Sequence, residues 1–387
     1  MSKMARELCL EVVRREKATY GHGKLDRLIR RDWDPFPETI ERWKNEGWNG
    51  DFSCFHYDPS PYFSLGKNVD LDIVLVDLVG IDLPVMPKFE SKIVNADDKY
   101  FYFQTVSGAI EKFTRDKKRG GEIMPEYYQM PVECEDDWHY KIKPRLDPNT
   151  PERWGNFAYA DQAAQLVKEG IKLYGGSAIG GYMFLRAMLG PEQVMYTLYD
   201  NPDMIHDMMR SWLQLVKTCL LRTQEKVPFF KILFGEDIAY KTDLLISPGM
   251  IAEFLSPYYA DLLDALCSHQ EEEIIFEIDS DGNMNKFIPI YKTMGFKAFD
   301  PFEIAAGNDI VQIGKEHPDI ILLGGIDKRI LAKSKEEIKQ YLDAIMPYLT
   351  KRGGYIPTCD HFIPSNVPFE NYQYYRDLVV SMDGVPQ

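Results

Sequence analysis

The chain has 387 residues, of which 45% are hydrophobic, and its formal net charge is −15. This length and apolar content allow one large buried core, since α/β barrels routinely reach such lengths as single domains. The acidic charge argues against nucleic acid or an anionic membrane surface as a partner. The basic runs Arg30-Arg31 and Lys117-Lys118-Arg119 are short, and we interpret them as solvated surface.

The cysteines and the N-terminus bear on the compartment. No CxxC pair occurs among Cys9, Cys54, Cys134, Cys219, Cys267 and Cys359. A chain of this size does not need disulfide staples, so we expect free thiols in a reducing compartment. Residues 1–15 lack the apolar region of a signal peptide, and no apolar stretch is long enough to cross a membrane. The sequence therefore predicts a cytoplasmic protein and leaves its oligomeric state open.

The first part of the chain mixes short helical and strand-like patterns. We predict helices over 4–16 and 37–46, a strand over 73–79, and a hairpin of strands 92–93 and 100–105. The segment 117–151 is charged and dotted with proline, and we interpret it as an excursion from the domain.

From about residue 157, short apolar runs alternate with longer amphipathic segments. The runs predict strands over 171–175, 229–235, 274–279, 296–300, 320–323 and 354–358. The amphipathic segments predict helices over 191–199, 202–226, 248–269, 283–294, 306–315, 335–349 and 371–382. Ser247-Pro248 and Ser334 with Glu337 have the spacing of helix N-caps.

Alternating strands and helices indicate a parallel sheet, and this number of units closes most easily into a barrel. The nucleotide-binding spacing of glycines and the P-loop lysine are both missing. We therefore predict an α/β fold, a (β/α)8 TIM barrel with an N-terminal helical and hairpin elaboration. One domain would span 1–387, with 1–156 holding the elaboration and first barrel elements and 157–387 the main repeat region.

Three carboxylates alternate at the end of one apolar strand. Glu277, Asp279 and Asp281 point the same way in an extended chain and repel one another. They need a cation, a proton or basic partners to coexist. One interpretation is a solvated acidic loop with a turn at Asp281-Gly282, and the other is a metal or acid–base site.

Four more strand ends carry reactive groups. The strands end in Glu236-Asp237, in Glu303, in Asp327-Lys328-Arg329 and in Cys359-Asp360-His361. The active sites of TIM barrels form where strands end, so these groups together indicate a catalytic face. Tyr182 and Phe184 follow the Gly180-Gly181 pair, which lets a ligand approach closely, and they either pack in the core or line the substrate site.

These same stretches resemble the uroporphyrinogen-decarboxylase-like superfamily, over about residues 170 to 385. The resemblance is carried in order by residues 235–237 with 246–248, by 279–282, by 301–309, by 324–328 and by 353–368. True decarboxylases of the superfamily bind a polyanionic porphyrinogen through an arginine-rich N-terminal motif, which this sequence lacks. The resemblance therefore favours the branch that exchanges methyl groups with a corrinoid protein, often with zinc.

The resemblance also implies a ligand set. Positions matching the metal site of that branch are Asp279, Asp281 and His361, with Glu303 as a further ligand. The branch often uses thiolates there, and an oxygen- and nitrogen-rich set instead leaves zinc more electrophilic. This profile is similar to that of aryl-ether O-demethylases, which pass a methyl group from a methoxylated aromatic to the cobalt of a corrinoid (cobalamin-type) protein.

The remaining roles follow from this hypothesis. The metal, Asp237 or Tyr240 would stabilise the leaving phenolate, with Glu236 beside them, and Tyr182, Phe184 and Cys359 would contact the methyl donor. A decarboxylase or metal-dependent lyase of the same superfamily, or a member without catalysis, are the alternatives.

Overall fold

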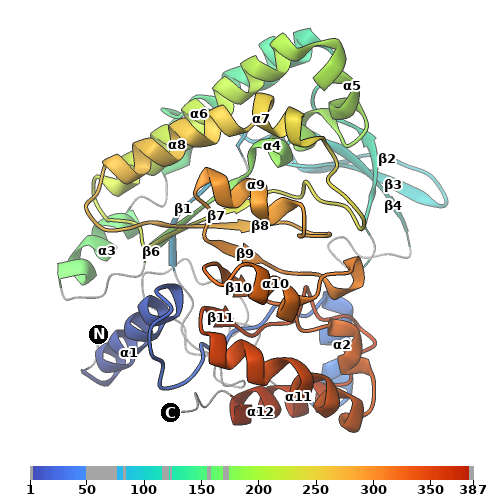
Figure 1. The fold of residues 1–387 in the computed structure, drawn as a ribbon. Helices are drawn as coiled ribbons and strands as arrows, with labels where there is room; N and C mark the ends of the chain where they lie inside the picture. Colours follow the sequence, from blue (N-terminus) through green and yellow to red (C-terminus); the bar gives the residue numbers. More distant parts are fainter. Residues whose placement is uncertain are drawn as a thin grey trace.

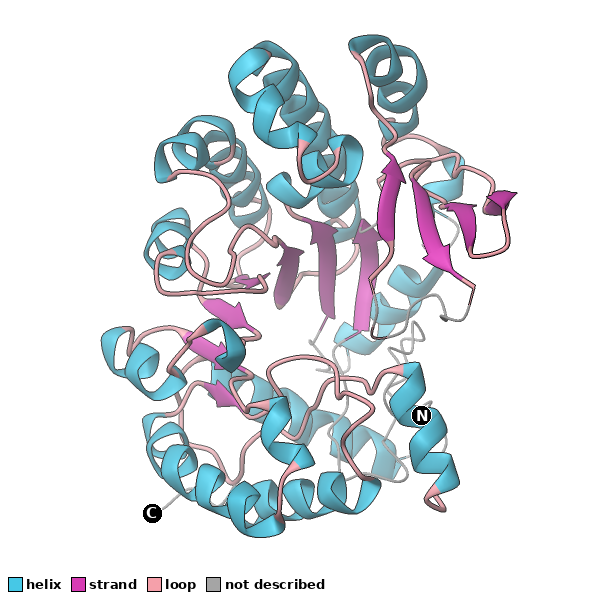
Figure 2. Cartoon of the chain, turned by 90° about the vertical axis from the view of Figure 1, so that its right-hand side faces the viewer, coloured by secondary structure: helices cyan, strands magenta, loops and turns pink. Residues whose placement is uncertain are grey.

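The computed structural model describes residues 3–48, 76–81, 84–115, 122, 124–154, 158–168 and 174–382. Its central sheet has, in these residues, seven strands that all pair in parallel, in the order β1-β6-β7-β8-β9-β10-β11. The strands are β1 (Val76–Ile81), β6 (Tyr174–Ile179), β7 (Lys231–Gly235), β8 (Ile275–Asp279), β9 (Ala298–Asp300), β10 (Ile321–Leu323) and β11 (Tyr355–Ile356). The predicted TIM barrel is confirmed, with helices outside the strands (Figures 1 and 2).

Helices follow the strands along the chain and cover the sheet. The helices are α1 (Lys3–Tyr20), α2 (Pro37–Asn45), α3 (Ala158–Lys168), α4 (Gly181–Leu189), α5 (Gln193–Asp200), α6 (Pro202–Gln224), α7 (Pro248–Phe254), α8 (Ser256–Ser268), α9 (Phe287–Met294), α10 (Ile310–Glu316), α11 (Lys335–Arg352) and α12 (Phe369–Met382). Helices α2 and α4–α12 contribute buried apolar residues to the same core as the strands. Shorter helical turns cover Asp137–Ile142, Lys143–Leu146, Pro151–Trp154, Ile304–Ala306 and Lys328–Ala332.

A second, antiparallel sheet projects from one side of the barrel (Figure 1). It consists of β2 (Lys92–Ala96), β3 (Tyr100–Gln104), β4 (Ile110–Thr114) and β5 (Glu126–Gln129). The hairpin of β2 and β3 is confirmed, and Asp97 forms its turn by accepting hydrogen bonds from the backbone of Lys99 and Tyr100. The sequence analysis did not predict β5, which lies in the charged excursion.

Most predicted helices are confirmed, and a few elements differ from the prediction. The predicted helix over 248–269 divides at Leu255 into α7 and α8. Helix α4 was not predicted, and β6 begins at Tyr174, where the predicted strand was about to end. Both N-caps are confirmed, since Ser247 accepts from the Met250 amide and Ser334 forms a capping box with Glu337. The described part of the chain holds no helix that is both long and apolar enough to span a membrane.

The amino ends of the strands hold a buried polar network. Lys231 forms an ion pair with Glu277 at 2.6 Å, and the Tyr20 hydroxyl donates to the other oxygen of Glu277 at 2.9 Å. Arg31 is mostly buried and pairs with the buried carboxylate of Glu16. The prediction of a solvated Arg30-Arg31 run was therefore wrong for Arg31, because α1 supplies a buried counter-charge. The Lys117-Lys118-Arg119 run lies outside the described residues.

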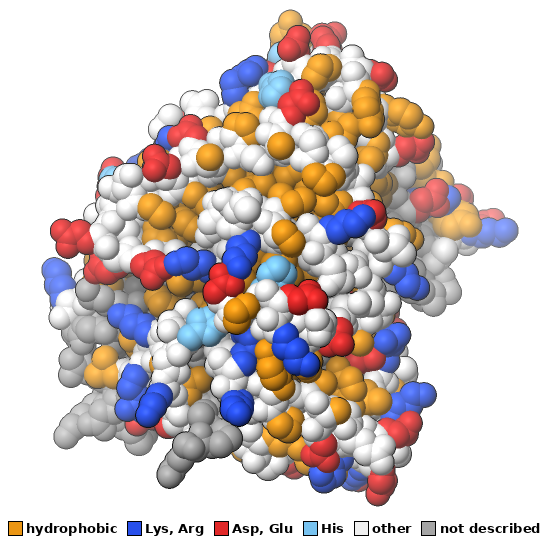
Figure 3. Space-filling view, in the orientation of Figure 1, with side chains coloured by type: hydrophobic (Ala, Val, Ile, Leu, Met, Phe, Trp, Pro, Cys, Tyr) orange, Lys and Arg blue, Asp and Glu red, His pale blue; other side chains and the backbone are white. Residues whose placement is uncertain are grey.

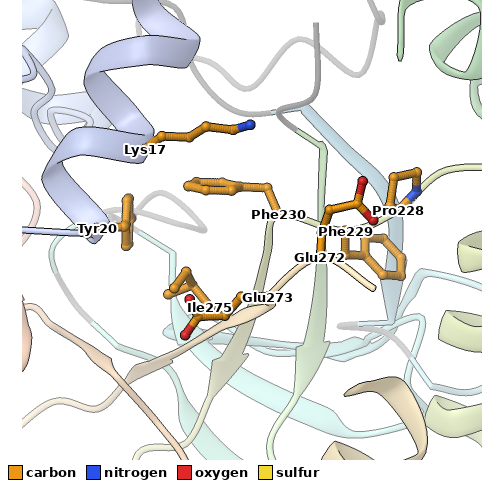
Figure 4. A pocket seen from close by; sticks show the side chains of 9 residues that line it. Lys17, Tyr20, Pro228, Phe229, Phe230, Glu272, Glu273 and Ile275 are labelled. Carbon is orange, nitrogen blue, oxygen red and sulfur yellow. The ribbon is translucent and has the colours of Figure 1, made fainter. Parts of the chain in front are cut away.

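A cavity of about 280 Å³ also lies at this end (Figure 4). Lys17 and Tyr20 of α1 line it together with Phe230, Glu272 and Glu273, which precede β7 and β8. Tyr20 meets Phe230 edge to face at 5.5 Å. In TIM barrels the amino ends of the strands serve stability and the carboxyl ends carry the chemistry. We therefore assign this hollow to the packing of α1 on the barrel.

Candidate functional site

The carboxyl ends of β7, β8 and β9 are level with one another. Gly235 pairs with Asp279, and Asp279 pairs with Asp300. The ladder continues one residue further, because the Glu236 amide donates to the Asp279 carbonyl at 2.7 Å and the Ser280 amide to the Asp300 carbonyl at 3.0 Å. The residues that follow these strands therefore meet at one rim of the barrel, as the sequence predicted.

Three carboxylates converge at this rim and form what we call the acid cluster: Asp237, Asp279 and Asp281. Each offers one oxygen such that the three oxygens lie within 4.8 Å of one another. The Asp281 amide donates to Asp237 Oδ1 at 3.1 Å, which holds the loops after β7 and β8 together. Of the two interpretations of this strand end, the geometry favours a site over an isolated acidic loop.

Two carboxylates of the acid cluster, Asp279 and Asp281, have raised pKa values. The pKa of Asp281 is raised to about 7, first by burial and then by the charges of Asp237 and Glu303. Burial also raises the pKa of Asp279 well above its usual range, and Asp300 is the next largest cause. Excess negative charge in a confined place is what a bound cation would neutralise.

His361 and Glu303 lie beside the acid cluster. His361 Nε2 is 3.7 Å from Asp281 Oδ1, and burial followed by the charge of Lys328 lowers the pKa of His361 to about 4. The imidazole is therefore neutral at physiological pH, the form that binds metals. Glu303 accepts from the Gly282 amide at 3.1 Å and lies 3.5 Å from Lys328 Nζ.

Two cationic side chains border the acid cluster. Arg186 of α4 approaches Asp237 Oδ2 at 3.9 Å, and Lys328 approaches Glu303. The charges of both side chains act on Asp281 and lower its pKa in opposition to the larger effect of burial. The site therefore combines a carboxylate centre with positive charge at its border.

Asp360 ties three loops of the rim together. Its carboxylate accepts from the Ile304 amide and the Lys328 amide, each at 2.9 Å. Burial raises the pKa of Asp360 to about 6, and the two backbone donors oppose that rise. Asp360 thus links the loops after β9 and β10 to the loop after β11, which carries His361.

Gly282 shapes the turn after the acid cluster. Its φ is +95°, and a Cβ there would lie 2.7 Å from the backbone carbonyl of Ala239. We expect Gly282→Ala to cost about 1–3 kcal/mol of unfolding free energy, because the turn must shift. Denaturant titration checks this. Gly249→Ala is the matched control, since a Cβ there meets only Ser247 Oγ at 3.7 Å; equal losses in both variants would contradict the role of the turn.

Glu236 does not face the rim with Asp237. It is fully buried and accepts hydrogen bonds from the amides of Tyr182 and Met183 and from the hydroxyls of Tyr259 and Tyr291. It thereby caps the amino end of α4, which has no side-chain cap of its own. The prediction that Glu236 is a catalytic group was wrong. Glu236 and Asp237 are consecutive residues of an extended chain, so their side chains point to opposite sides, and only Asp237 joins the acid cluster.

The three predicted substrate contacts are also buried in the core. Tyr182 and Phe184 lie in the first turn of α4 and face inward, where Phe184 meets Trp138. Cys359 is fully buried, and burial raises its pKa well above the usual value. The alternative of core packing is therefore the correct one, and Cys359 is corrected with it. Tyr240 is 63% exposed, and its carbonyl accepts from the Asn283 amide beside the acid cluster.

The sequence analysis missed several groups at the rim. Asp300, Arg186 and Trp33 were not among the predicted site residues, although Asp300 was recognised as a strand end. Trp33 stacks on His361, with ring centroids 5.5 Å apart and planes within 6°. Only the three-dimensional fold brings residue 33 beside residue 361, so no local signal pointed to it.

The donor set of the acid cluster fits a divalent cation. Metal–oxygen bonds of about 2.1 Å place ligand oxygens up to about 4.2 Å apart, which the described cluster approaches. Asp237, and not the predicted Glu303, is the third carboxylate of the cluster; Glu303 contacts the Gly282 amide and Lys328 beside it. The residues that would hold the ion are therefore Asp237, Asp279 and Asp281; the predicted ligand His361 lies beside this group, with Nε2 3.7 Å from Asp281 Oδ1.

The fold and the polar rim define a TIM barrel that carries its ionisable groups at the carboxyl ends of its strands. The family model of uroporphyrinogen decarboxylase (URO-D) matches residues 121–382, and the chain belongs to this family. No curated protein matches it.

Among solved structures, a methyltransferase from Methanosarcina mazei is similar at 14% identity and a TM-score of 0.55. The match covers 94% of this chain and 97% of that one, and it supports the fold. A xylanase B from Clostridium stercorarium F9 matches at 12% identity, with 54% and 72% of the two chains covered and a TM-score of 0.31.

Proposed function

We propose that the protein is a methyltransferase that moves a methyl group from an aryl methyl ether to the cobalt of a corrinoid protein, assisted by zinc. The observation that carries the proposal is the convergence of Asp237, Asp279 and Asp281 beside a neutral His361. The structural similarity to a methyltransferase over most of both chains supports it. A substrate with many carboxylates would instead be repelled by the acid cluster, which weighs against the decarboxylase alternative.

The ligand set suits the chemistry of an ether. A cation held by carboxylates and imidazole would act as a Lewis acid towards the ether oxygen. In the proposed reaction, the cobalt(I) of the partner would supply the electron pair for the new carbon–cobalt bond, and the bond between methyl carbon and oxygen would break with its electrons left on the phenolate. The reaction therefore needs no serine or cysteine nucleophile from this chain.

Side chains of this protein would also stabilise the negative charge on the leaving phenolate oxygen. Arg186 and Lys328 lie at the border of the acid cluster and offset negative charge that develops there. Because the pKa of His361 is lowered, its imidazole is neutral and does not repel a bound cation. Asp237 would be held as a carboxylate by the cation, so the exposed Tyr240 remains the candidate for delivering a proton to the phenolate.

In the space-filling view, acidic and basic side chains are intermixed over the face shown (Figure 3). That face offers no single field of one sign that would steer a highly charged partner.

The reaction is tested with the purified protein, cob(I)alamin and a panel of methoxyphenols and methoxybenzoates. We expect methylcobalamin to form, seen by its absorption, together with a stoichiometric amount of the demethylated phenol. Absence of methylcobalamin with every donor, in protein shown to contain metal, would contradict the proposal.

Removing the metal tests the role of the acid cluster. We expect zinc by elemental analysis, loss of nearly all methyl transfer after dialysis against a chelator, and recovery when zinc is added back. Full activity in protein shown to be free of metal would rule out metal assistance, whatever the donor.

A further inference from the structure

The segment 32–36 runs alongside the chain that follows β11. Pro35 and Ile363 form a parallel bridge, the Phe36 amide donates to the Ile363 carbonyl, and the Ile363 amide donates to the Asp34 carbonyl, both at 3.1 Å. Because the paired residue Ile363 lies two residues after His361, this pairing places the segment at the rim. An N-terminal segment thereby becomes part of the mouth of the barrel.

A buried ion pair fixes Trp33 in this segment. Asp32 Oδ1 accepts from the amides of Trp33 and Cys359, at 3.0 and 2.9 Å. Asp32 Oδ2 lies 3.5 Å from Arg376, and both side chains are buried. These contacts hold the backbone of Trp33 beside the chain at Cys359, and the indole then packs against His361 and Phe362.

Four rings gather here and form what we call the ring cluster: Trp33, Phe36, His361 and Phe362. Their centroids are 5.0–6.4 Å apart in the contacting pairs. All four side chains are partly exposed, and His361 is 24% exposed. A set of partly exposed rings offers a planar ligand both a face and edges to stack on.

The ring cluster ends at the acid cluster. His361 belongs to the former and reaches Asp281 of the latter at 3.7 Å. A molecule whose ring lies against the ring cluster therefore brings a ring substituent towards the three carboxylates. An aryl methyl ether has this form, with the ether oxygen attached directly to the ring.

We propose that the ring cluster binds the aromatic ring of the methyl donor, and that Trp33 is the specificity-determining residue that favours aryl over aliphatic methyl donors. The proposal rests on the proposed function for the reaction that follows binding. The rings pack on one another and present one surface, whereas a methylated ammonium ion is recognised by rings that surround it. The structure therefore favours an arene over an organic cation.

Trp33→Ala, Trp33→Leu and Trp33→Phe separate ring stacking from bulk. Calorimetry on metal-loaded protein measures the Kd of a methoxybenzoate and of tetramethylammonium, and steady-state assays give KM and kcat. We expect Trp33→Ala and Trp33→Leu to weaken arene binding about tenfold and to raise KM, with kcat at saturation within about twofold of the wild type. Trp33→Phe should restore most of the affinity, because it retains an aromatic face.

Trp154→Ala is the matched control, since Trp154 is also a partly exposed tryptophan but packs on Arg222 outside the ring cluster. Metal content is measured in each variant, because a purely structural role through His361 would lower metal content and kcat rather than arene affinity. Unchanged arene affinity in Trp33→Leu, or Trp33-dependent binding of tetramethylammonium without arene binding, would overturn the inference.

The two proposals fail in different ways. If arenes bind in a Trp33-dependent manner but the wild type forms no methylcobalamin, the ring site holds and the proposed reaction is wrong. If methyl transfer from arenes proceeds with the same KM in Trp33→Leu, the reaction holds and the role of Trp33 is wrong.

Discussion

Replacing Asp281 by asparagine is expected to abolish stable metal binding and to reduce methyl transfer on the order of a hundredfold or more. Asp281 lies between the other members of the site: its amide donates to Asp237 at 3.1 Å and its Oδ1 is 3.7 Å from His361 Nε2. The asparagine retains the shape and the backbone contact but loses the charge. Elemental analysis and the cob(I)alamin assay measure the two effects.

The same substitution should stabilise the metal-free protein. The pKa of Asp281 is raised to about 7 in the folded state, against an ordinary value near 4, so folding favours its protonated form. The contribution of Asp281 to the stability of the metal-free wild type therefore falls as pH rises from about 4 to about 7, and Asp281→Asn lacks this loss. We expect the variant to melt higher than the wild type at pH 8 and equally at pH 4.

Asp343→Asn is the control for this pair of effects. Asp343 forms an exposed ion pair with Lys339 one turn earlier in α11, outside the acid cluster, and its loss should change stability by less than about 0.5 kcal/mol. Normal metal content in Asp281→Asn would remove this residue from the ligand set. A lower melting temperature at pH 8 without metal would show that the acid cluster is not under electrostatic strain.

The carboxyl-end rim could be predicted because its signal is local in the sequence. Each buried strand is an apolar run in the sequence, and polar residues follow it. Because the strands are parallel, their carboxyl ends lie at the same end of the barrel. Asp237, Asp281, Glu303 and His361 meet at the rim for this reason. The prediction required only the order of the elements.

The direction of each side chain could not be predicted in the same way. Glu236 and Asp237 are adjacent, yet one caps α4 and the other joins the acid cluster. The aromatic residues after Gly180-Gly181 were assigned to the site because α4 was not foreseen, and its first turn directs them into the core. Trp33 depends on a pairing across more than 300 residues, which no pattern near residue 33 encodes.

The largest effect on stability is expected at Glu236. Glu236→Ala should cost about 3–5 kcal/mol of unfolding free energy, the range for removing one partner of a buried hydrogen-bonded network, because four buried donors lose their acceptor. The donors are the Tyr182 and Met183 amides and the Tyr259 and Tyr291 hydroxyls, at 3.0–3.3 Å. Urea denaturation measures the loss. Glu253, exposed on α7, is the matched control, and its alanine variant should stay within about 0.5 kcal/mol of the wild type.

Glu236→Gln distinguishes the charge of this group from its hydrogen bonds. Burial raises the pKa of Glu236 to about 7, while the four donors oppose that rise. A raised folded-state pKa means that the carboxyl stabilises the protein most when protonated, and that this contribution is lost as pH rises from about 4 to about 7. The cost of Glu236→Gln should therefore be larger at pH 4 than at pH 8. If the cost instead grows with pH, the donors outweigh burial, and α4 is capped by a carboxylate that stays ionised throughout this range.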